Sequence, residues 1–162
     1  MTLLDRVLPG VEHLHNLHPL TVHFPIAYLM GAALLYAVSW IWPNEKREWA
    51  AYWLLLLGFW ASNVAMATGF YAYWEVALTK SVRQRLASPH MSWMVATYLI
   101  TIGLTSWAVV DKPFPRAGRR LFLLLFVTLL MALTIGADYG SRLVYDYNAS
   151  GNAVSHPIRY SR

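Results

Sequence analysis

Histidine is the residue type in this chain best suited to metal chemistry, because the sequence contains six histidines and no cysteine. The lack of cysteine excludes disulfides, thiolate metal sites and iron–sulfur ligation. Neutral imidazole binds zinc, copper or haem iron. The histidines all fall on one side of the apolar segments described below; they are His13, His15, His18, His23, His90 and His156.

Two of these histidines are predicted to lie inside a membrane and to face each other. His23 lies about four residues into an apolar run, roughly 6 Å below its first turn, and His90 opens another run from the same side. Imidazoles from two helices of a bundle form the axial ligand pair of a haem. We therefore predict His23 and His90 as axial ligands of a haem b iron. His18 is the substitute for either, and a second haem would use nearly all the histidines.

Other interpretations of the same histidines stay open. His18 and His23 are five residues apart, about 140° around a regular helix, so they do not both reach one iron. A histidine inside a membrane often only hydrogen-bonds to a neighbouring hydroxyl, amide or carbonyl, and Thr68 and Asn63 offer such partners. The pair His13 and His15, together with His18, could instead collect a surface zinc or copper ion.

Residues close to His90 would complete a haem site. Arg83 and Arg85 precede it and could pair with haem propionates, or they could serve as ordinary interfacial anchors. Met91 and Met94 flank His90, which leaves a His–Met iron open, although both could equally be apolar packing residues.

The composition of the chain predicts a membrane protein. Of 162 residues, 57% are apolar and only 13% are charged, against roughly a quarter charged in soluble domains. Four apolar runs approach the about 20 residues that a helix needs to cross a bilayer. The sequence thus predicts an all-α, integral membrane four-helix bundle. It forms one domain with spans at 19–42, 49–75, 90–110 and 121–144, a polar N-terminal segment at 1–18 and a polar tail at 145–162.

Lysine and arginine indicate how the bundle is oriented. The side with both termini carries seven of them, and the other side carries six that are concentrated in two short loops. Density near helix ends favours those loops as cytoplasmic, so we predict both termini outside the cytoplasmic membrane. The net charge of +5 then matches anionic lipid headgroups, and no nucleic-acid partner is expected.

Three segments carry a resemblance to a known family. The run from His18 to Ala27, HPLTVHFPIA, is similar to the HPxxVHFPIA signature of the bacterial DUF2231 family of predicted membrane proteins. Residues 67–70 resemble the A-x-T-G segment of that family, and residues 140–145 resemble its closing GGxLVY, with Ser141 in place of the second glycine. His90 matches the position of the family's histidine at the start of the third helix. The resemblance spans about residues 14–154.

The resemblance implies a role in membrane electron transfer, because members occur beside or fused to cytochrome c, Rieske-type or dehydrogenase modules. We therefore expect a haem-binding subunit that passes electrons between the quinone pool and an extracytoplasmic redox partner. A haem-free anchor or assembly subunit is the alternative, and a small transporter or metal-binding protein is a third interpretation. No hydrolytic or phosphate-binding motif is present, so an independent enzyme is not expected.

Overall fold

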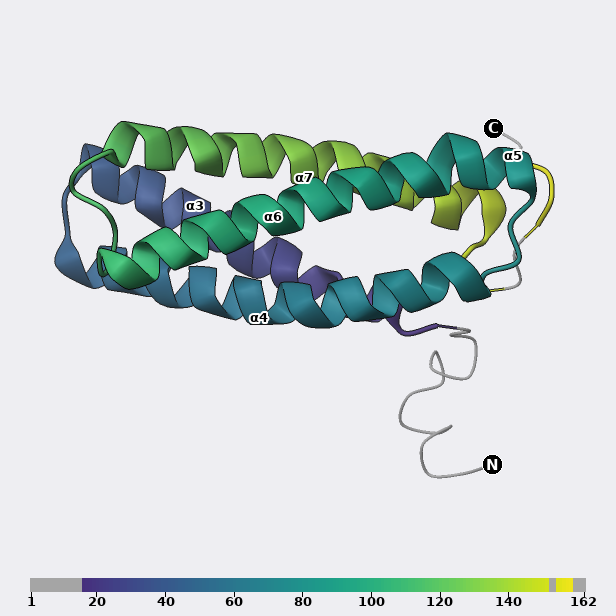
Figure 1. Cartoon of the computed structure of the whole chain (residues 1–162), viewed down its shortest axis with the longest axis horizontal. Helices are drawn as coiled ribbons and strands as arrows, with labels where there is room; N and C mark the ends of the chain where they lie inside the picture. Colours follow the sequence, from purple (N-terminus) through teal and green to yellow (C-terminus); the bar gives the residue numbers. More distant parts are fainter. Residues whose placement is uncertain (1–15, 152–153, 159–162) are drawn as a thin grey trace, which may run out of the picture.

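The computed structural model describes residues 16–151 and 154–158, and within them the chain is helical and contains no strand. Its helices in chain order are α2 (His18–Thr21), α3 (His23–Ile41), α4 (Glu45–Glu75), α5 (Lys80–Val82), the π-helical turn η2 (Arg83–Ala87), α6 (Ser88–Val110) and α7 (Arg119–Tyr147). They form two antiparallel hairpins, α3–α4 and α6–α7 (Figure 1).

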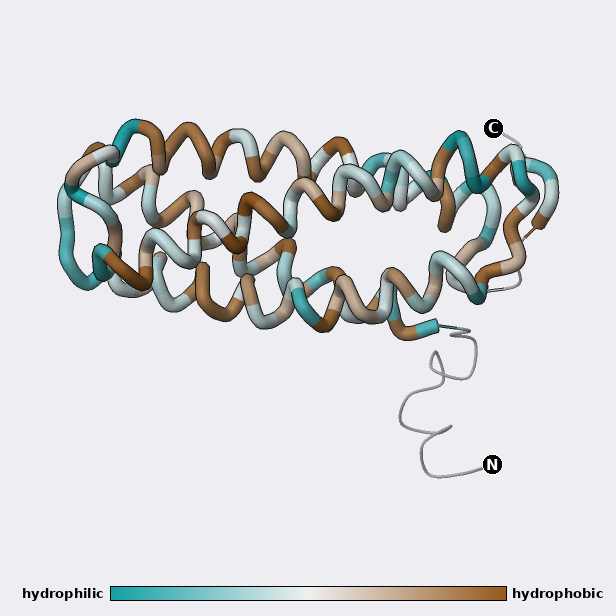
Figure 2. The backbone as a smooth tube through the Cα atoms, viewed as in Figure 1, coloured by the Kyte–Doolittle hydropathy of each residue, from teal (hydrophilic) through white to brown (hydrophobic). Residues whose placement is uncertain are grey.

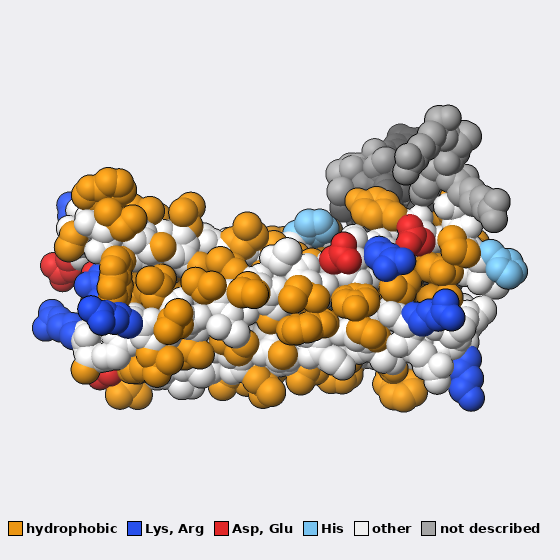
Figure 3. Space-filling view, turned by 90° about the horizontal axis from the view of Figure 1, so that it is seen from above, with side chains coloured by type: hydrophobic (Ala, Val, Ile, Leu, Met, Phe, Trp, Pro, Cys, Tyr) orange, Lys and Arg blue, Asp and Glu red, His pale blue; other side chains and the backbone are white. Residues whose placement is uncertain are grey.

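Four helical segments of the described chain are long and apolar enough to cross a membrane: His18–Ile41, Glu45–Glu75, Lys80–Val110 and Arg119–Tyr147. Hydrophilic residues concentrate near the two ends of the bundle, and apolar residues run along each helix (Figure 2). Charged side chains likewise gather toward the ends of the visible face (Figure 3). These features confirm the predicted four-helix membrane bundle.

The third span differs from the sequence prediction, which placed a basic loop before a helix starting at 90. The helical run begins at Lys80 instead, after Thr79, whose hydroxyl accepts the N–H of Val82 at 3.5 Å. Pro89 has no N–H for an ordinary helical bond. The wider π turn just before it, in which the N–H of Ser88 bonds to the carbonyl of Arg83 five residues back, keeps the backbone helical up to that proline.

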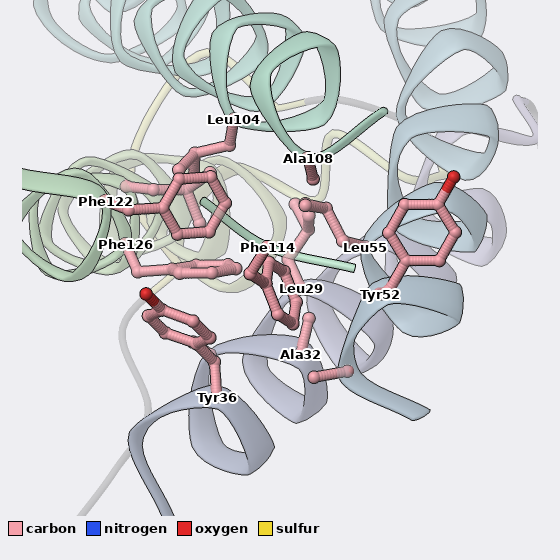
Figure 4. Packing of buried hydrophobic residues seen from close by; sticks show 13 residues of the cluster. Leu29, Ala32, Tyr36, Tyr52, Leu55, Leu104, Ala108, Phe114, Phe122 and Phe126 are labelled. Atoms are coloured by element: carbon pink, nitrogen blue, oxygen red, sulfur yellow. The ribbon is translucent and has the colours of Figure 1, made fainter. Parts of the chain in front are cut away.

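The main hydrophobic core lies toward the end of the bundle that holds the loops 42–44 and 111–118. We call this the loop end, and the two hairpins meet there. Tyr36 is fully buried there, with its ring centroid 4.6 Å from that of Phe114 and 5.2 Å from that of Phe122 (Figure 4). Leu55 of α4 and Leu104 of α6 belong to the same cluster and join the hairpins. At this end Arg119 pairs with Glu48 at 3.1 Å, which ties α7 to α4.

The hairpins separate toward the other end, where the described chain enters and leaves. Figure 1 shows α4 and α6 meeting near the loops and lying apart at this end. A smaller cluster of Val82, Leu86, Ala87 and Leu143 packs η2 against α7 here. The space between the two clusters contains the candidate site.

Candidate functional site

A cavity of about 370 Å³ lies between the two hairpins, in the half of the bundle nearer the chain ends. This volume is within the about 300–1,000 Å³ of typical ligand and cofactor sites. All four long helices line the cavity, mainly with apolar side chains, and no Lys, Arg, Asp or Glu of the described chain is among the lining residues. The buried part of a ligand here would therefore be apolar and carry no net charge that needs a partner.

Two imidazoles from opposite hairpins meet in this cavity. His18 lies on α2, which packs on α4, and His90 lies on α6, which packs on α7. Their ring centroids are 6.1 Å apart and the ring planes are inclined by 72°. Two imidazoles on opposite sides of one metal ion, each with a nitrogen about 2.0–2.1 Å from it, would have centroids about 6.3 Å apart. The spacing thus fits one metal ion between the two rings.

Local structure at the start of α2 positions His18. Its backbone N–H donates to Oδ1 of Asn16 at 3.2 Å, and the amide of the buried Asn16 donates to the carbonyl of Ala149 at 3.4 Å. Pro19 occupies the first turn, where its missing N–H costs nothing. The backbone that carries His18 is therefore anchored to the segment that follows α7.

The ring of His18 is oriented by Thr68 of α4, whose Oγ1 lies 3.3 Å from Nδ1. The Thr68 hydroxyl donates to the carbonyls of Val64 and Ala65, each at 3.1 Å. With its single proton directed to these carbonyls, the Thr68 oxygen can accept from the ring, and we therefore assign the ring hydrogen to Nδ1. Nε2 of His18 consequently keeps its lone pair for a ligand.

The ring of His90 is held in the same way by α7. Nδ1 of His90 lies 2.7 Å from the carbonyl oxygen of Gly136. A carbonyl only accepts hydrogen bonds, so Nδ1 donates and Nε2 of His90 also keeps its lone pair. Partners of this kind on the second ring nitrogen fix the orientation of metal-binding histidines.

Two glycines leave room for these rings. A Cβ atom added at Gly69 would lie 2.8 Å from Cε1 of His18, and one added at Gly140 would lie 2.8 Å from Cε1 of His90. Both distances are shorter than side chains tolerate, so any larger residue would displace the ring beside it. The surfaces of α4 and α7 thus leave space for the two imidazole rings at these glycines.

His23 takes a different place from the one predicted for it. It lines the cavity, but its side chain is exposed, and the described chain shows no ring contact between it and His18 or His90. The described residues also contain no group of three or more His, Asp or Glu side chains arranged to hold a metal ion. The structure therefore brings His90 together with His18, the predicted substitute, and the axial role of His23 stays a prediction.

The two predicted propionate partners do not line the cavity. The guanidinium of Arg83 donates to the carbonyls of Tyr73 and Val76 at the end of α4, and it lies 5.0 Å from the centroid of the Tyr73 ring. Arg85 is exposed. The uncharged polar residues Asn16, Ser141 and Ser150 line the cavity instead, so propionate binding by the arginines stays a prediction.

The remaining sequence candidates are distributed as follows. Met91 and Met94 line the cavity, and the methyl group of Met94 packs closely against Gly136. His156 is exposed in the segment after α7. His13 and His15, the predicted surface metal pair, lie outside the described residues.

The supporting partners of the two rings were not predicted as such from the sequence. The sequence indicates Thr68 only as one of several possible hydrogen-bond partners, and it gives no role to the carbonyl of Gly136. The available signal is the position of Gly69 and Gly140 inside the family-like segments, because a fixed glycine on a helix indicates close approach by another group.

Comparison with known proteins identifies one family. The model of the family described as "Predicted membrane protein (DUF2231)" matches residues 14–152. This range includes His18, His23 and His90 together with all four long helices. Neither the curated proteins nor the solved structures contain a match to the chain.

Proposed function

The chain belongs to the DUF2231 family of predicted membrane proteins, and we propose that it binds one b-type haem between the imidazoles of His18 and His90. The observation that carries this proposal is the pair of rings 6.1 Å apart, each with its Nδ1 hydrogen already bonded and its Nε2 lone pair left over. Two neutral imidazoles with borderline-soft nitrogen donors suit haem iron.

The surroundings of the two rings fit a porphyrin. The lining is apolar and without charged side chains, as a porphyrin ring requires. The uncharged polar residues in the lining, among them Asn16 and Ser150, offer hydrogen bonds for propionate groups. A zinc or copper ion alone would leave most of the about 370 Å³ cavity unfilled, and no third His, Asp or Glu side chain of the described chain is grouped with the two rings.

The residues of the chain have separate roles in this proposal. His18 and His90 bind the iron, and Thr68 and the Gly136 carbonyl fix the ring orientation and make the ligand nitrogens more basic. The apolar lining excludes water and lowers the local dielectric, which tunes the reduction potential. The bound haem supplies one-electron redox chemistry.

We place this haem protein in the bacterial cytoplasmic membrane with both termini on the periplasmic side. Its electron partners are then the lipid-soluble quinone pool and an extracytoplasmic redox protein of the cytochrome c, Rieske or dehydrogenase type. The haem lies in the half of the bundle nearer the termini, which is the half closer to such a partner. The chain is thus an electron-transfer subunit and not an independent enzyme.

The test is an optical spectrum of the protein purified in detergent from haem-sufficient cells. We expect a Soret band that shifts when dithionite is added, lost or converted to a five-coordinate form in His18→Ala and in His90→Ala. His156→Ala, which removes an exposed histidine that does not line the cavity, should leave the spectrum unchanged. A colourless preparation would overturn the proposal and favour the haem-free anchor. A normal spectrum in His18→Ala would overturn the assigned ligand pair.

A further inference from the structure

His23 is a polar side chain inside a membrane-spanning segment, and its ring has no partner among the residues that the structure describes. It is the first residue of α3, its side chain is exposed, and no hydrogen bond or ion pair within the described chain engages the ring. An ionisable side chain within a membrane span costs free energy, and such residues usually have a function. His23 is therefore a candidate for a function separate from that of His18 and His90.

The position of His23 points to a ligand that arrives from the lipid. The residue lines the same cavity as the two paired histidines, yet its own surface neighbours along the chain are apolar and exposed. Leu20 is 52% exposed and Phe24 is 54% exposed, so the edge of the cavity at His23 lies between exposed apolar side chains of the first membrane-spanning segment.

The charge of the lining restricts the chemistry of that ligand. No cationic side chain of the described chain lines the cavity, so it lacks the Arg or Lys partners that a phosphate or an anionic lipid headgroup needs. A neutral imidazole offers one N–H donor and one nitrogen acceptor. It therefore suits a neutral ring that carries carbonyl or hydroxyl groups and is otherwise apolar.

Building on the proposed haem function, we propose that His23 is the hydrogen-bonding residue for the ring head of a lipid-soluble quinone, which reaches the exposed edge of the cavity at His23, beside the haem, from the membrane. The N–H of the imidazole donates to a quinone carbonyl, and its free nitrogen accepts from a quinol hydroxyl. Both redox forms of the ligand are thus bound by the same side chain. Along the helix, five residues separate this position from His18, or about 7.5 Å at 1.5 Å per residue.

The test uses an azido-quinone photolabel on the full-length protein in phosphatidylcholine nanodiscs, with the labelled peptides identified by mass spectrometry. We expect labelling around residue 23 that an excess of decylubiquinone suppresses. His23→Leu should lower it by about tenfold or more, roughly the loss of a specific hydrogen bond to a ligand. His23→Gln, which keeps a donor and an acceptor, should retain much of the labelling, and His156→Gln should retain all of it.

Two outcomes would overturn this inference. One is labelling in His23→Leu equal to that of the natural chain, and the other is suppression of the label by phosphatidylglycerol as effectively as by decylubiquinone. Haem content is measured on the same samples from the Soret band. A sample with haem but without His23-dependent labelling contradicts the quinone site alone, whereas a colourless sample contradicts the proposed haem function.

Discussion

The hydrogen bonds on Nδ1 of the two paired histidines decide what their rings can do. Each ring uses one nitrogen to bond a neighbouring helix, Thr68 on α4 for His18 and the Gly136 carbonyl on α7 for His90. The other nitrogen is left as a lone-pair donor. The helices that line the cavity thus also fix the orientation of the two imidazole rings.

Thr68→Val tests this role because it replaces the hydroxyl with a methyl group of similar size. Nδ1 of His18 would lose its partner, and we expect haem affinity to fall by about 10- to 100-fold, as for other residues that support a metal ligand. Thr68→Ser keeps the hydroxyl and should restore most of the affinity. The measurement is a haem titration of the apoprotein followed at the Soret band. Equal affinity in the Val and Ser variants would contradict the role.

Gly140→Ala tests the space reserved for His90. The added Cβ would lie 2.8 Å from Cε1 of that ring, so the ring must shift and the iron ligation should weaken or change its spin state. Gly103→Ala is a matched control, because a Cβ at that helical glycine meets nothing within 4 Å. Both variants should keep their helical circular dichroism. A normal haem spectrum in Gly140→Ala would show that the ring is not confined as the structure indicates.

At the scale of elements, the π turn η2 connects the end of α4 with the helix that carries His90. Arg83 within this turn reaches back to the carbonyls of Tyr73 and Val76 at the end of α4, where the helix dipole favours a positive charge. The turn therefore fixes α6 relative to α4 at the open end of the cavity.

Replacing Arg83 should loosen this connection. Arg83→Gln removes charge-assisted hydrogen bonds worth about 1.5–3 kcal/mol each, reduced here because the side chain is only partly buried. We expect a melting temperature lower by several degrees, while Arg85→Gln, at an exposed position, should have almost no effect. Thermal unfolding followed by intrinsic fluorescence in detergent provides the comparison. Identical melting temperatures for the two variants would contradict a stabilising role for the hydrogen bonds from Arg83 to the end of α4.

At the scale of the whole molecule, the two hairpins are joined at one end by an aromatic core and lie apart at the other, around the cavity. The described chain therefore has a closely packed end and, at the other end, a cavity lined by all four long helices. Under the proposed function, the side of the membrane on which the haem lies depends on which end of the bundle faces the periplasm.

The absence of cysteine from the chain makes this orientation directly measurable. Ser81→Cys lies at the terminal end and Arg116→Cys lies in the loop between α6 and α7. A membrane-impermeant maleimide added to intact spheroplasts should label Ser81→Cys, whereas Arg116→Cys should react only after the membrane is opened. The reverse pattern would place the termini in the cytoplasm.

The sequence predicts the helices of this fold far better than it predicts their rotation. Long apolar runs are enough to identify four spans, but the helices carry apolar residues on nearly every face, so no polar stripe tells which side is buried. This is why His23, which is deeper by residue count, was preferred to His18. The ring of His18 is brought into the bundle by contacts distant in sequence, with Thr68 and through the Asn16 anchor to Ala149.

The start of the third helix was missed for a related reason. Lys80, Arg83 and Arg85 form a basic run that is typical of a loop between membrane spans. Their charges are accommodated because this helical turn extends beyond the apolar run, and Arg83 is satisfied by backbone carbonyls of α4. Only the packed structure supplies that partner.

Electron paramagnetic resonance of the oxidised protein tests most directly whether His18 and His90 share one iron. The ring planes are inclined by 72°, and nearly perpendicular imidazole planes leave two iron d orbitals close in energy. We therefore predict a strongly anisotropic low-spin ferric signal that His23→Ala retains and that His18→Ala and His90→Ala convert to high spin. The absence of a haem signal, or a low-spin signal unchanged in His18→Ala, would contradict the account.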